Sequence, residues 1–352
     1  MRVLAVNAGS TSVKVSLLDG EQTLAEYDGL EQALGECGTA RLDAVAHRIV
    51  HGGRRTAAVV VDDAVVDELR GLVELAPLHQ PPALDALERC RTALPDLPHV
   101  ACFDTAFHTT LPEAARTYAL PARLREQVRV HGFHGLSHAW ATGRVRALAP
   151  RARRLVVAHL GGGASLCAVL DGRSVHTTMG FTPLDGLVMA TRSGALDPGA
   201  VLWLAQHTDE DLPVVLARES GLLGLCGTGD MQEVLRRQAE GDAAAGQALE
   251  VYLHRLVVAL GGCVAALGGL DALVFTAGVG EHAQQVRERV AQRLAWLGVA
   301  VAEGGDAGPV GGDREVTAPG AGVRTFVVHA REDLQMASEL QRLLAGQLAG
   351  GV

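Results

Sequence analysis

The 352-residue sequence has almost no lysine, asparagine or isoleucine. Asn7 and Lys14 are the only residues of their kinds, whereas arginine accounts for all the other members of the 31 lysines and arginines. A chain that uses arginine at nearly every basic position but keeps one lysine indicates that this lysine is needed. Asn7 and Lys14 are therefore the first functional candidates, although the single Ile49 shows that rarity alone is weak evidence.

The sequence also lacks the patterns that mark several classes of protein. Its six cysteines show no CxxC spacing and lie mostly in apolar runs, which favours reduced core residues over disulfides or metal ligands. The net charge of −9 argues against an extended nucleic-acid surface. No basic and apolar leader opens the chain, and the most apolar run, 256–270, is too short to span a bilayer. We therefore expect a cytoplasmic enzyme with no nucleic-acid or membrane partner.

The first twenty residues predict a β-hairpin that occurs twice in the chain. Strand 3–6, a small polar turn, strand 13–18 and an Asp-Gly turn are repeated in 155–172, at a constant offset of 152 and without a gap. The offset places Asn7 on His159, and a period this long indicates two duplicated domains. Small residues at a tight turn let backbone N–H groups approach an anion, so both hairpins are predicted phosphate cradles, with Lys14 adding charge.

Hydrophobic periodicity predicts most of the remaining elements. The expected strands are 42–50, 99–103, 272–276 and 323–328. The expected helices are 63–75, 83–93, 113–129, 198–206, 212–218, 243–267, 282–297 and 333–348, with another opening at 131–138. The stretch 21–38 is polar and unpatterned.

A few charged and polar residues stand where ligands bind in open α/β sheets, at strand ends and in glycine-flanked loops. Arg48 and Arg192 offer the planar pair of donors that a carboxylate or phosphate needs. Asp104 and Glu332 each follow a strand and could hold Mg²⁺, a hard cation that takes one or two carboxylates plus phosphate. For each of these four residues the alternative is a structural ion pair.

Among the histidines, only His79, His134 and His159 lie in loops that carry other candidates, and the rest are expected to be structural or exposed. The turn 278–280, Gly-Val-Gly between a strand and a helix, suits the phosphate or ribose of a nucleotide but also occurs for packing reasons. Neither a Walker loop nor a Rossmann fingerprint is present.

Eight motifs, taken in order, resemble the acetate kinase (acetokinase) family over nearly the whole chain. They are VNAGSTSVK (6–14), HRIVHGG (47–53), APLHQPP (76–82), FDTAFH (103–108), GFHGLSH (132–138), MGFTPLDGL (179–187), TRSGALDP (191–198) and FTAGVGE (275–281). The resemblance implies an α/β fold of two duplicated ribonuclease-H-like (actin-like ATPase) domains with the active site in the cleft between them. The implied domains are 1–104 with helix 333–352 packing back on it, and 105–332 with the nucleotide site.

The implied reaction is a reversible, Mg²⁺-dependent transfer of a phosphoryl group between ATP and acetate, giving ADP and acetyl phosphate. Mn²⁺ is an alternative metal, and the resemblance implies a homodimer. By motif, Asn7 and Glu332 match metal positions, and Asp104 and Arg192 match catalytic positions together with His134 and His159.

The resemblance also assigns the substrate and nucleotide positions. Substrate binding falls on Arg48, His79, Val50, Leu78, Phe133 and Pro183, of which the last four form the pocket for the acyl methyl group. Nucleotide or phosphate binding falls on Ser12, Lys14, His159, Leu160, Gly161, Gly162, Gly163, Asp230, Met231, Gln232, Ala277, Gly278, Val279, Gly280 and Glu281.

Several positions depart from the family pattern. The region between Gly20 and Val45 is short, Gly162 stands where asparagine is usual, Gln232 replaces a common arginine, and Arg331 replaces the asparagine before Glu332. These departures bear on nucleotide choice more than on the reaction. A propionate or other short-chain carboxylate kinase remains the nearest alternative, and a non-catalytic nucleotide-binding regulator of the same fold is the alternative from another class.

Overall fold

The computed structural model describes residues 1–9, 13–37, 42–77, 79–302, 304 and 312–350. The chain forms two compact units, each with its own sheet. Unit 1 comprises Met1–Thr109, Phe133–Trp140 and Arg331–Val352, and unit 2 comprises Thr110–Gly132 and Ala141–Ala330. By packing, Phe133–Trp140 thus belongs with unit 1, whereas the division inferred from sequence placed this segment in the second domain.

The sheet of unit 1 contains six strands among the described residues. Their order is β3 (Gln22–Tyr27), β2 (Val13–Asp19), β1 (Arg2–Ala8), β4 (Ala44–Ile49), β6 (His99–Phe103) and β5 (Val59–Val60). The first three form an antiparallel meander, β1, β4 and β6 run parallel, and β5 is an antiparallel edge strand.

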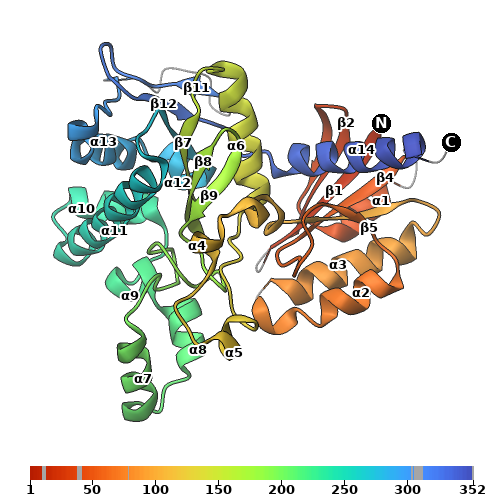
Figure 1. Cartoon of the computed structure of the whole chain (residues 1–352), viewed down its shortest axis with the longest axis horizontal. Coiled ribbons are helices and arrows are strands. Elements are labelled where there is room, and N and C mark those ends of the chain that lie inside the picture. The colour runs from red at the N-terminus through yellow and green to blue at the C-terminus, as the bar shows by residue number, and fades with distance from the viewer. Residues whose placement is uncertain (10–12, 38–41, 78, 303, 305–311, 351–352) are drawn as a thin grey trace. The chain divides into compact units, whose positions relative to one another are not determined.

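Helices cover both faces of this sheet because its central strands are apolar on both sides. Leu4 and Val6 of β1 belong to one core cluster, which includes residues of α1 (Leu30–Cys37), α2 (Asp63–Arg70) and α3 (Gln80–Ala93). Val3 and Ala5 belong to the other cluster, with α14 (Glu332–Gly350). Figure 1 shows α14 across one face of the red and orange strands, and α2 and α3 on the other.

The sheet of unit 2 repeats this arrangement among the described residues. Its order is β11 (Arg314–Glu315), β12 (Arg324–Val327), β10 (Ala272–Thr276), β7 (Arg154–Leu160), β8 (Ala164–Leu170) and β9 (Arg173–Thr177). Strands β7, β8 and β9 again form an antiparallel meander, and β7, β10 and β12 run parallel. The shared topology confirms the predicted α/β fold of two duplicated domains.

The duplicated hairpins differ by one residue in their turns, which corrects the gapless alignment. Ala8 pairs with Val13, leaving four residues in the first turn, but Leu160 pairs with Ala164, leaving three in the second. The offset is therefore 152 on the first strand and 151 on the second, so that Lys14 corresponds to Ser165. A gap placed in a glycine-rich turn is easily missed, because the apolar strands on either side still align approximately.

The remaining elements lie in unit 2, apart from one short 3-10 helix of unit 1 and two elements that belong to both units. The 3-10 helix of unit 1 is η1 (Val73–Leu75), and the 3-10 helix η2 (Ala106–Thr110) lies in unit 1 except for its last residue, which belongs to unit 2. Helix α6 (Gly135–Leu148) begins in unit 1 and ends in unit 2. The others are α4 (Glu113–Arg116), α5 (Ala122–Arg125), α7 (Pro198–His207), α8 (Leu212–Val214), η3 (Val215–Glu219, a π-helix), α9 (Gly221–Cys226), α10 (Met231–Ala239), α11 (Ala243–Leu267), α12 (Ala277–His282), α13 (Gln284–Arg293) and η4 (Ala295–Leu297).

Three sequence expectations are wrong in detail. The stretch 21–38 contains β3 and α1; β3 is an edge strand that buries only one residue, so its hydrophobic signal is weak. The stretch 113–129 holds only the four-residue helices α4 and α5, each preceded by proline. Residues 277–281 form α12 instead of a turn.

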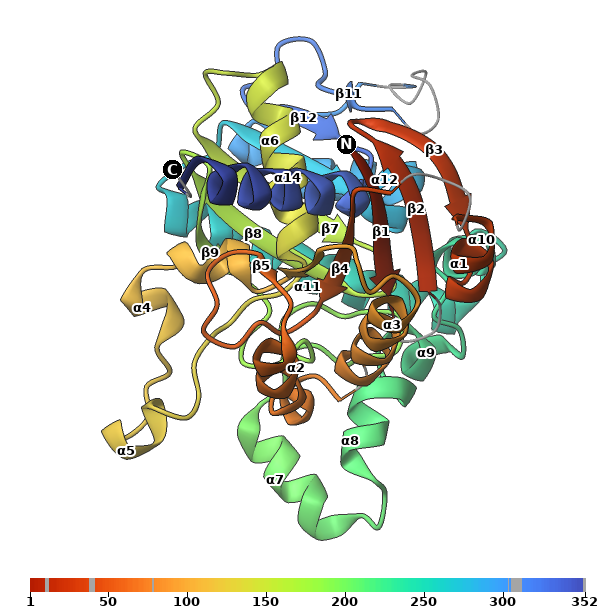
Figure 2. The ribbon, with the colours of Figure 1, turned by 90° about the vertical axis from the view of Figure 1, so that its right-hand side faces the viewer.

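Helix α11 is long and apolar enough, by length and composition alone, to cross a membrane. It spans 25 residues, Ala243–Leu267, which are the bounds predicted from the sequence, and it therefore begins well before the apolar run at 256–270. In unit 2 it packs against β7, β8 and β9 and against helices α9, α10 and α13. Its buried leucines thus belong to the core of this unit. The ribbon of α11 is labelled in Figure 2.

Replacing Leu340 with alanine is expected to destabilise unit 1. Its side chain is fully buried between α14 and the sheet, so the substitution should cost about 2–5 kcal/mol of unfolding free energy through lost burial and a residual cavity. Denaturant titration would measure the change. Leu148→Ala at the end of α6, where the residue is 45% exposed, is the matched control and should stay within about 0.5 kcal/mol. Equal effects of the two substitutions would contradict the packing of α14.

Candidate functional site

One guanidinium group organises the polar cluster of unit 1. Arg48 donates from Nε and Nη2 to Oδ2 of Asp104, at 3.0 and 2.7 Å, and from Nη1 to Oδ1 of Asn7 and Oε2 of Glu332, at 3.1 Å each. Asn7 in turn donates from Nδ2 to the same Glu332 oxygen at 2.9 Å. Four residues that the sequence singled out separately are thus in direct contact.

Neighbouring parallel strands bring these side chains together. Arg48 lies near the carboxyl end of β4, and Asp104 immediately follows β6, where its N–H donates to the carbonyl of Ile49. Asn7 lies near the end of β1, next to β4, and Glu332 is the first residue of α14. Carboxyl ends of parallel strands are where open α/β sheets place ligands.

Burial and charge oppose one another in this cluster. Burial raises the pKa of Asp104 to about 6, with Arg48 acting against the shift and Glu332 adding to it. Burial would lower the pKa of Arg48, but the carboxylates of Asp104 and Glu332 hold it above its ordinary value. Arg48 is therefore a permanent cation in a partly dehydrated site.

The oxygens around Arg48 are of the kind that hard divalent cations prefer. They come from two carboxylates and one side-chain amide, and Oδ1 of Asp104 is buried and accepts no hydrogen bond from another described side chain. Among the described residues, no group of three or more histidine, cysteine or acidic side chains is placed to hold a metal ion. The donor set therefore fits a cation that completes its coordination with water and substrate oxygens.

The loop before α6 presses against Asp104. Gly135 donates its N–H to the carbonyl of Asp104 at 2.8 Å, and a Cβ on Gly135 would lie 2.1 Å from that oxygen. The preceding His134 has a φ of 57°, unusual for a residue other than glycine, and its side chain is half-buried. Strained backbone of this kind is held by its surroundings and is concentrated at functional sites.

Two residues predicted for the acyl pocket, Val50 and Phe133, are buried in unit 1. Val50 is buried, and the ring of the next residue, His51, contacts the buried Phe133 edge-on, with centroids 5.7 Å apart. His79 is half-buried just before α3, and Leu78 lies outside the described residues. Pro183 belongs to unit 2, where its carbonyl accepts a bond of 3.1 Å from Nη1 of Arg192.

A cavity of about 330 Å³ in unit 2 brings together seven of the fifteen predicted nucleotide residues. Its lining includes the predicted Gly161, Gly162, Asp230, Met231, Gln232, Gly278 and Val279. It also includes Ala190, Leu222, Gly229, Tyr252, His282 and Ala283, which sequence reasoning did not select. Three separate stretches of predicted residues therefore meet at this cavity.

Tyr252 is the most informative of the residues that were missed. Its hydroxyl group is buried, has no hydrogen-bond partner, and belongs to a side chain that lines the cavity. Burial also raises its pKa, so the group stays neutral and can donate. An unpaired buried hydroxyl is costly unless a ligand or water satisfies it. No sequence signal marked Tyr252, because a tyrosine inside a long apolar helix reads as core.

The other nucleotide candidates are placed differently. Lys14 is exposed and paired across the hairpin with Asn7, and Ser12 lies outside the described residues. Leu160 is fully buried, so only its backbone could serve a ligand. His159 is nearly buried at the end of β7, beside Thr276 of β10. Gly163, Ala277, Gly280 and Glu281 do not line the cavity.

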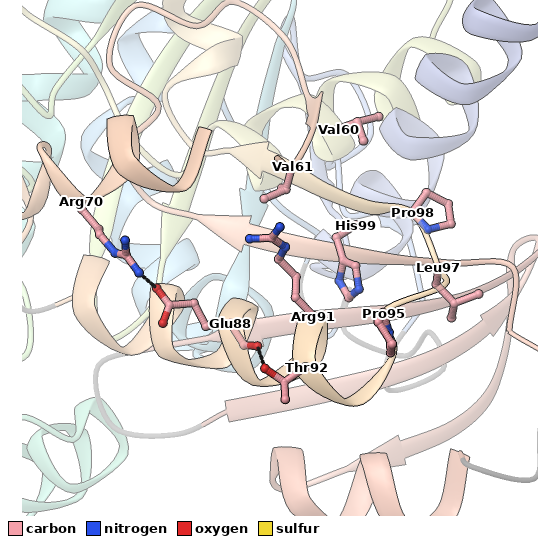
Figure 3. Close-up of a pocket in the computed structure, with 10 residues that line it drawn as sticks. All are labelled: Val60, Val61, Arg70, Glu88, Arg91, Thr92, Pro95, Leu97, Pro98 and His99. Atoms are coloured by element: carbon pink, nitrogen blue, oxygen red, sulfur yellow. Dashed lines mark hydrogen bonds and ion pairs between the residues drawn. The ribbon is translucent and has the colours of Figure 1, made fainter. Parts of the chain in front are cut away.

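Another hollow, of about 570 Å³, lies in unit 1 near the start of β6 (Figure 3). Its arginines already have acidic partners: Arg70 pairs with Glu88 and Arg91 with Asp63. None of the predicted site residues lines it, and we assign no chemistry to it.

The neighbouring histidines His47 and His99 form a structural pair. His99 Nε2 lies 3.0 Å from the carbonyl of Leu94, which can only accept, so Nε2 carries the proton and Nδ1 accepts from Nε2 of His47 at 3.0 Å. Burial lowers the pKa of His47 to about 3. His47 is therefore neutral and supports β4 beside Arg48, in agreement with the structural role expected for it.

Comparison with known proteins finds acetate kinases by sequence, and acetate and propionate kinases by structure. The sequence model of the acetokinase family matches residues 30–338. The chain is 48% identical over 314 residues to an acetate kinase of Rhodopseudomonas palustris, covering 87% of this chain and 78% of that protein. It superposes on a propionate kinase from Francisella tularensis with a TM-score of 0.88 at 32% identity, covering 96% of this chain and 98% of that one. An acetate kinase of Porphyromonas gingivalis gives the same TM-score at 30% identity, covering 97% and 99%.

Acid is expected to destabilise the protein partly through His47. The unfolded chain binds a proton at this residue below about pH 6.5 and the folded chain only near pH 3, so its contribution to stability is complete above the first value and is lost as the pH falls between them. The slope should reach about 1.4 kcal/mol per pH unit. Urea titrations between pH 7 and pH 5 should show a shallower dependence for His47→Gln. The exposed His254→Gln is the control, and an unchanged slope in His47→Gln would contradict this assignment.

Proposed function

This chain belongs to the acetokinase family, and we propose that it catalyses the reversible transfer of a phosphoryl group between ATP and acetate, giving ADP and acetyl phosphate. The observation that carries the proposal is the cluster of Asn7, Arg48, Asp104 and Glu332. It combines a permanent cation with oxygen ligands at the carboxyl ends of parallel strands. Direct transfer of a phosphoryl group between two anions requires such a cation and such ligands for a metal ion.

Arg48 is the proposed binding group for the acetate carboxylate. The charge of its guanidinium offsets the repulsion between the acid and the phosphates of ATP. Its contacts with Asp104 fix the guanidinium plane through two bonds to one oxygen. Val50, Leu78, Phe133 and Pro183 are proposed to enclose the methyl group, with His79 at the same substrate.

Acetate needs no general base, since a carboxylic acid with a pKa of about 4 is already ionised at neutral pH. We therefore assign Asp104 to orienting Arg48 and the metal's ligands instead of removing a proton. Arg192 is proposed to stabilise the charge on the phosphoryl group during in-line transfer, with His134 and His159 as further donors to it. Nη1 of Arg192 already donates to a backbone carbonyl, which restrains the side chain.

Asn7 and Glu332, with Asp104 beside them, are the residues proposed to hold Mg²⁺, or Mn²⁺, which prefers the same oxygen donors. When bound, the ion would offset the charge of the ATP phosphates. The buried Oδ1 of Asp104, which accepts no hydrogen bond from another described side chain, supports a polar partner at this place.

ATP is proposed to occupy the cavity of unit 2. Gly161 and Gly162 leave backbone accessible to phosphate, together with Gly163 and the side chains of Ser12 and Lys14 in the other hairpin. Gly278 and Val279 line the same cavity, and Tyr252 offers a hydroxyl group there. The proposed domains 1–104 with 333–352, and 105–332, would then hold the two substrates, and transfer requires them to bring the acceptor oxygen in line with the γ-phosphate.

Propionate is the proposed secondary substrate. One extra methylene changes binding in an apolar pocket by only about 1–3 kcal/mol, and the similar Francisella protein is a propionate kinase. We also propose a cytoplasmic homodimer. Helix α7 and its flank supply a surface for a second copy, because Leu196, Leu202 and Trp203 are exposed together there.

A hydroxamate assay with ATP and Mg²⁺ tests the reaction directly, since hydroxylamine traps any acyl phosphate formed. We expect product with acetate, less with propionate and little with butyrate. Each acid is assayed with ATP and with GTP, and omission of the acid is the blank. The absence of acyl phosphate from every acid with either nucleotide would refute the enzymatic proposal in favour of a nucleotide-binding regulator.

Replacing Arg192 with alanine should lower turnover by more than tenfold, because charge on the phosphoryl group would lose its stabilising cation, and tenfold corresponds to about 1.4 kcal/mol. Thermal unfolding should change little. Arg218→Ala, at an exposed arginine of the same unit, is the matched control and should retain full turnover. A turnover of Arg192→Ala within tenfold of the unaltered enzyme would show that the assigned role is wrong.

A further inference from the structure

The carboxylate of Glu281 has a structural partner that its sequence motif does not reveal. It lies near the end of α12, two residues after Val279, which lines the cavity of unit 2 with Gly278, yet Glu281 is itself absent from that lining. Its Oε1 accepts the N–H of Ala330 at 2.9 Å, and its Oε2 lies 2.6 Å from Nδ1 of His329. Only 6% of the residue is exposed. Both carboxylate oxygens of Glu281 are therefore engaged by the chain segment that follows β12.

A second carboxylate holds the same segment. Asp313 accepts the N–H of His329 at 3.1 Å through Oδ1, and its Oδ2 accepts from Nε of Arg144 at 2.5 Å. Two consecutive peptide N–H groups, at positions 329 and 330, thus each donate to a carboxylate. Both carboxylates are well shielded, since the side chain of Asp313 is only 11% exposed.

The backbone of Glu281 is also held in place by hydrogen bonds. Its carbonyl oxygen accepts from Nη1 of the buried Arg287 at 2.9 Å and from Nη2 of Arg314 at 3.2 Å. Burial would raise the pKa of Glu281, but the bonds from His329 and Ala330 keep it below its usual value, so the group remains an anion. Charge-assisted bonds of this kind are shorter and stronger than neutral ones.

The segment held in this way leads straight to the polar cluster. Unit 2 ends at Ala330 and unit 1 resumes at Arg331. Arg331 pairs with Asp333 and donates from Nη2 to Oγ1 of Thr23 at 2.6 Å, and the next residue is Glu332. Ala330 and Glu332 are two residues apart, so at most about 7 Å of chain joins them. Every residue from 329 to 333 is held by a hydrogen bond or ion pair of its side chain or its N–H. The contacts of Glu281 and Asp313 with this segment, called the clamp below, are therefore directly connected to Glu332.

We propose that Glu281, together with Asp313, is a positioning residue that holds segment 329–331 and thereby places Glu332 against Asn7 and Arg48. The proposal rests on the role given to Glu332 in the proposed reaction. It also assigns Glu281 a role other than the nucleotide contact that its motif implied. A positional error of about 1 Å in a catalytic cluster can lower a rate a hundredfold.

Kinetics of Glu281→Ala should separate positioning from nucleotide binding. We expect turnover to fall ten- to a hundredfold, whereas the dissociation constant of ATP, measured by calorimetry, should change less than threefold. Glu281→Gln keeps an acceptor for the Ala330 N–H and should recover most of the turnover. A larger loss in ATP affinity than in turnover would overturn the proposal, because it would show that Glu281 acts on the nucleotide.

A double-mutant cycle with Glu332→Gln tests whether the two residues act as one unit. They do not touch, so independent effects on turnover should multiply. If Glu281 acts through Glu332, the double variant should be only about as impaired as Glu332→Gln alone. Multiplying effects would refute the coupling. Glu315→Ala is the matched control, since it removes a carboxylate that binds Arg324 at the start of β12 and not at its end.

Amide hydrogen exchange provides a readout that does not depend on activity. Glu281→Ala should speed exchange in residues 329–332 at least tenfold, and Glu315→Ala should not. If Glu281→Ala fails to fold, Asp313→Ala should give the same local effect at His329. Unchanged exchange in these variants would show that the clamp does not hold the segment. Should the unaltered protein form no acyl phosphate, the proposed function fails, and the exchange result still decides whether the clamp exists.

Discussion

The bonds that Arg48 makes with Asp104 and Glu332 are the interactions on which the polar cluster of unit 1 depends. A buried guanidinium without partners would be expensive, and buried carboxylates without a cation would take up protons instead. The cluster is therefore stable only as a set: Asp104 holds the guanidinium plane, Glu332 and Asn7 share its far end, and each group satisfies another. A site that is already charged and partly dehydrated is also prepared to receive an anion and a divalent ion.

This cluster requires a fold that brings distant parts of the chain to one edge of a sheet. Parallel strands β1, β4 and β6 end side by side, so that three of the four residues follow from strand order alone. The fourth arrives through α14, whose apolar face packs on the sheet and whose first residue is Glu332. Since the same strand plan recurs in unit 2, duplication supplies a second such edge, and there the glycine turn faces a cavity instead of an ion cluster.

The two edges have evolved different surroundings from a common plan. Asn7 corresponds to His159, and Lys14 corresponds to Ser165 once the shorter second turn is taken into account. The paired side chains of the first hairpin are an amide and a cation, whereas the second has an imidazole and a hydroxyl. The segment that follows β12 is a further difference, because carboxylates of unit 2 hold it and it leads to Glu332.

The sequence by itself predicted the duplication and singled out the residues that meet around Arg48, because glycine turns, apolar strands and rare polar residues can be recognised locally. Its motifs resemble those of the acetokinase family, and this resemblance implied the fold class. The sequence could not reveal β3, whose edge position buries only one residue, or the missing residue in the second turn, because hydrogen-bond register is set by strand pairing. It also could not show that Glu281 faces Ala330, or that the hydroxyl of Tyr252 lines a cavity without a partner. The direction of a side chain depends on residues far away in the chain, and only tertiary packing decides it.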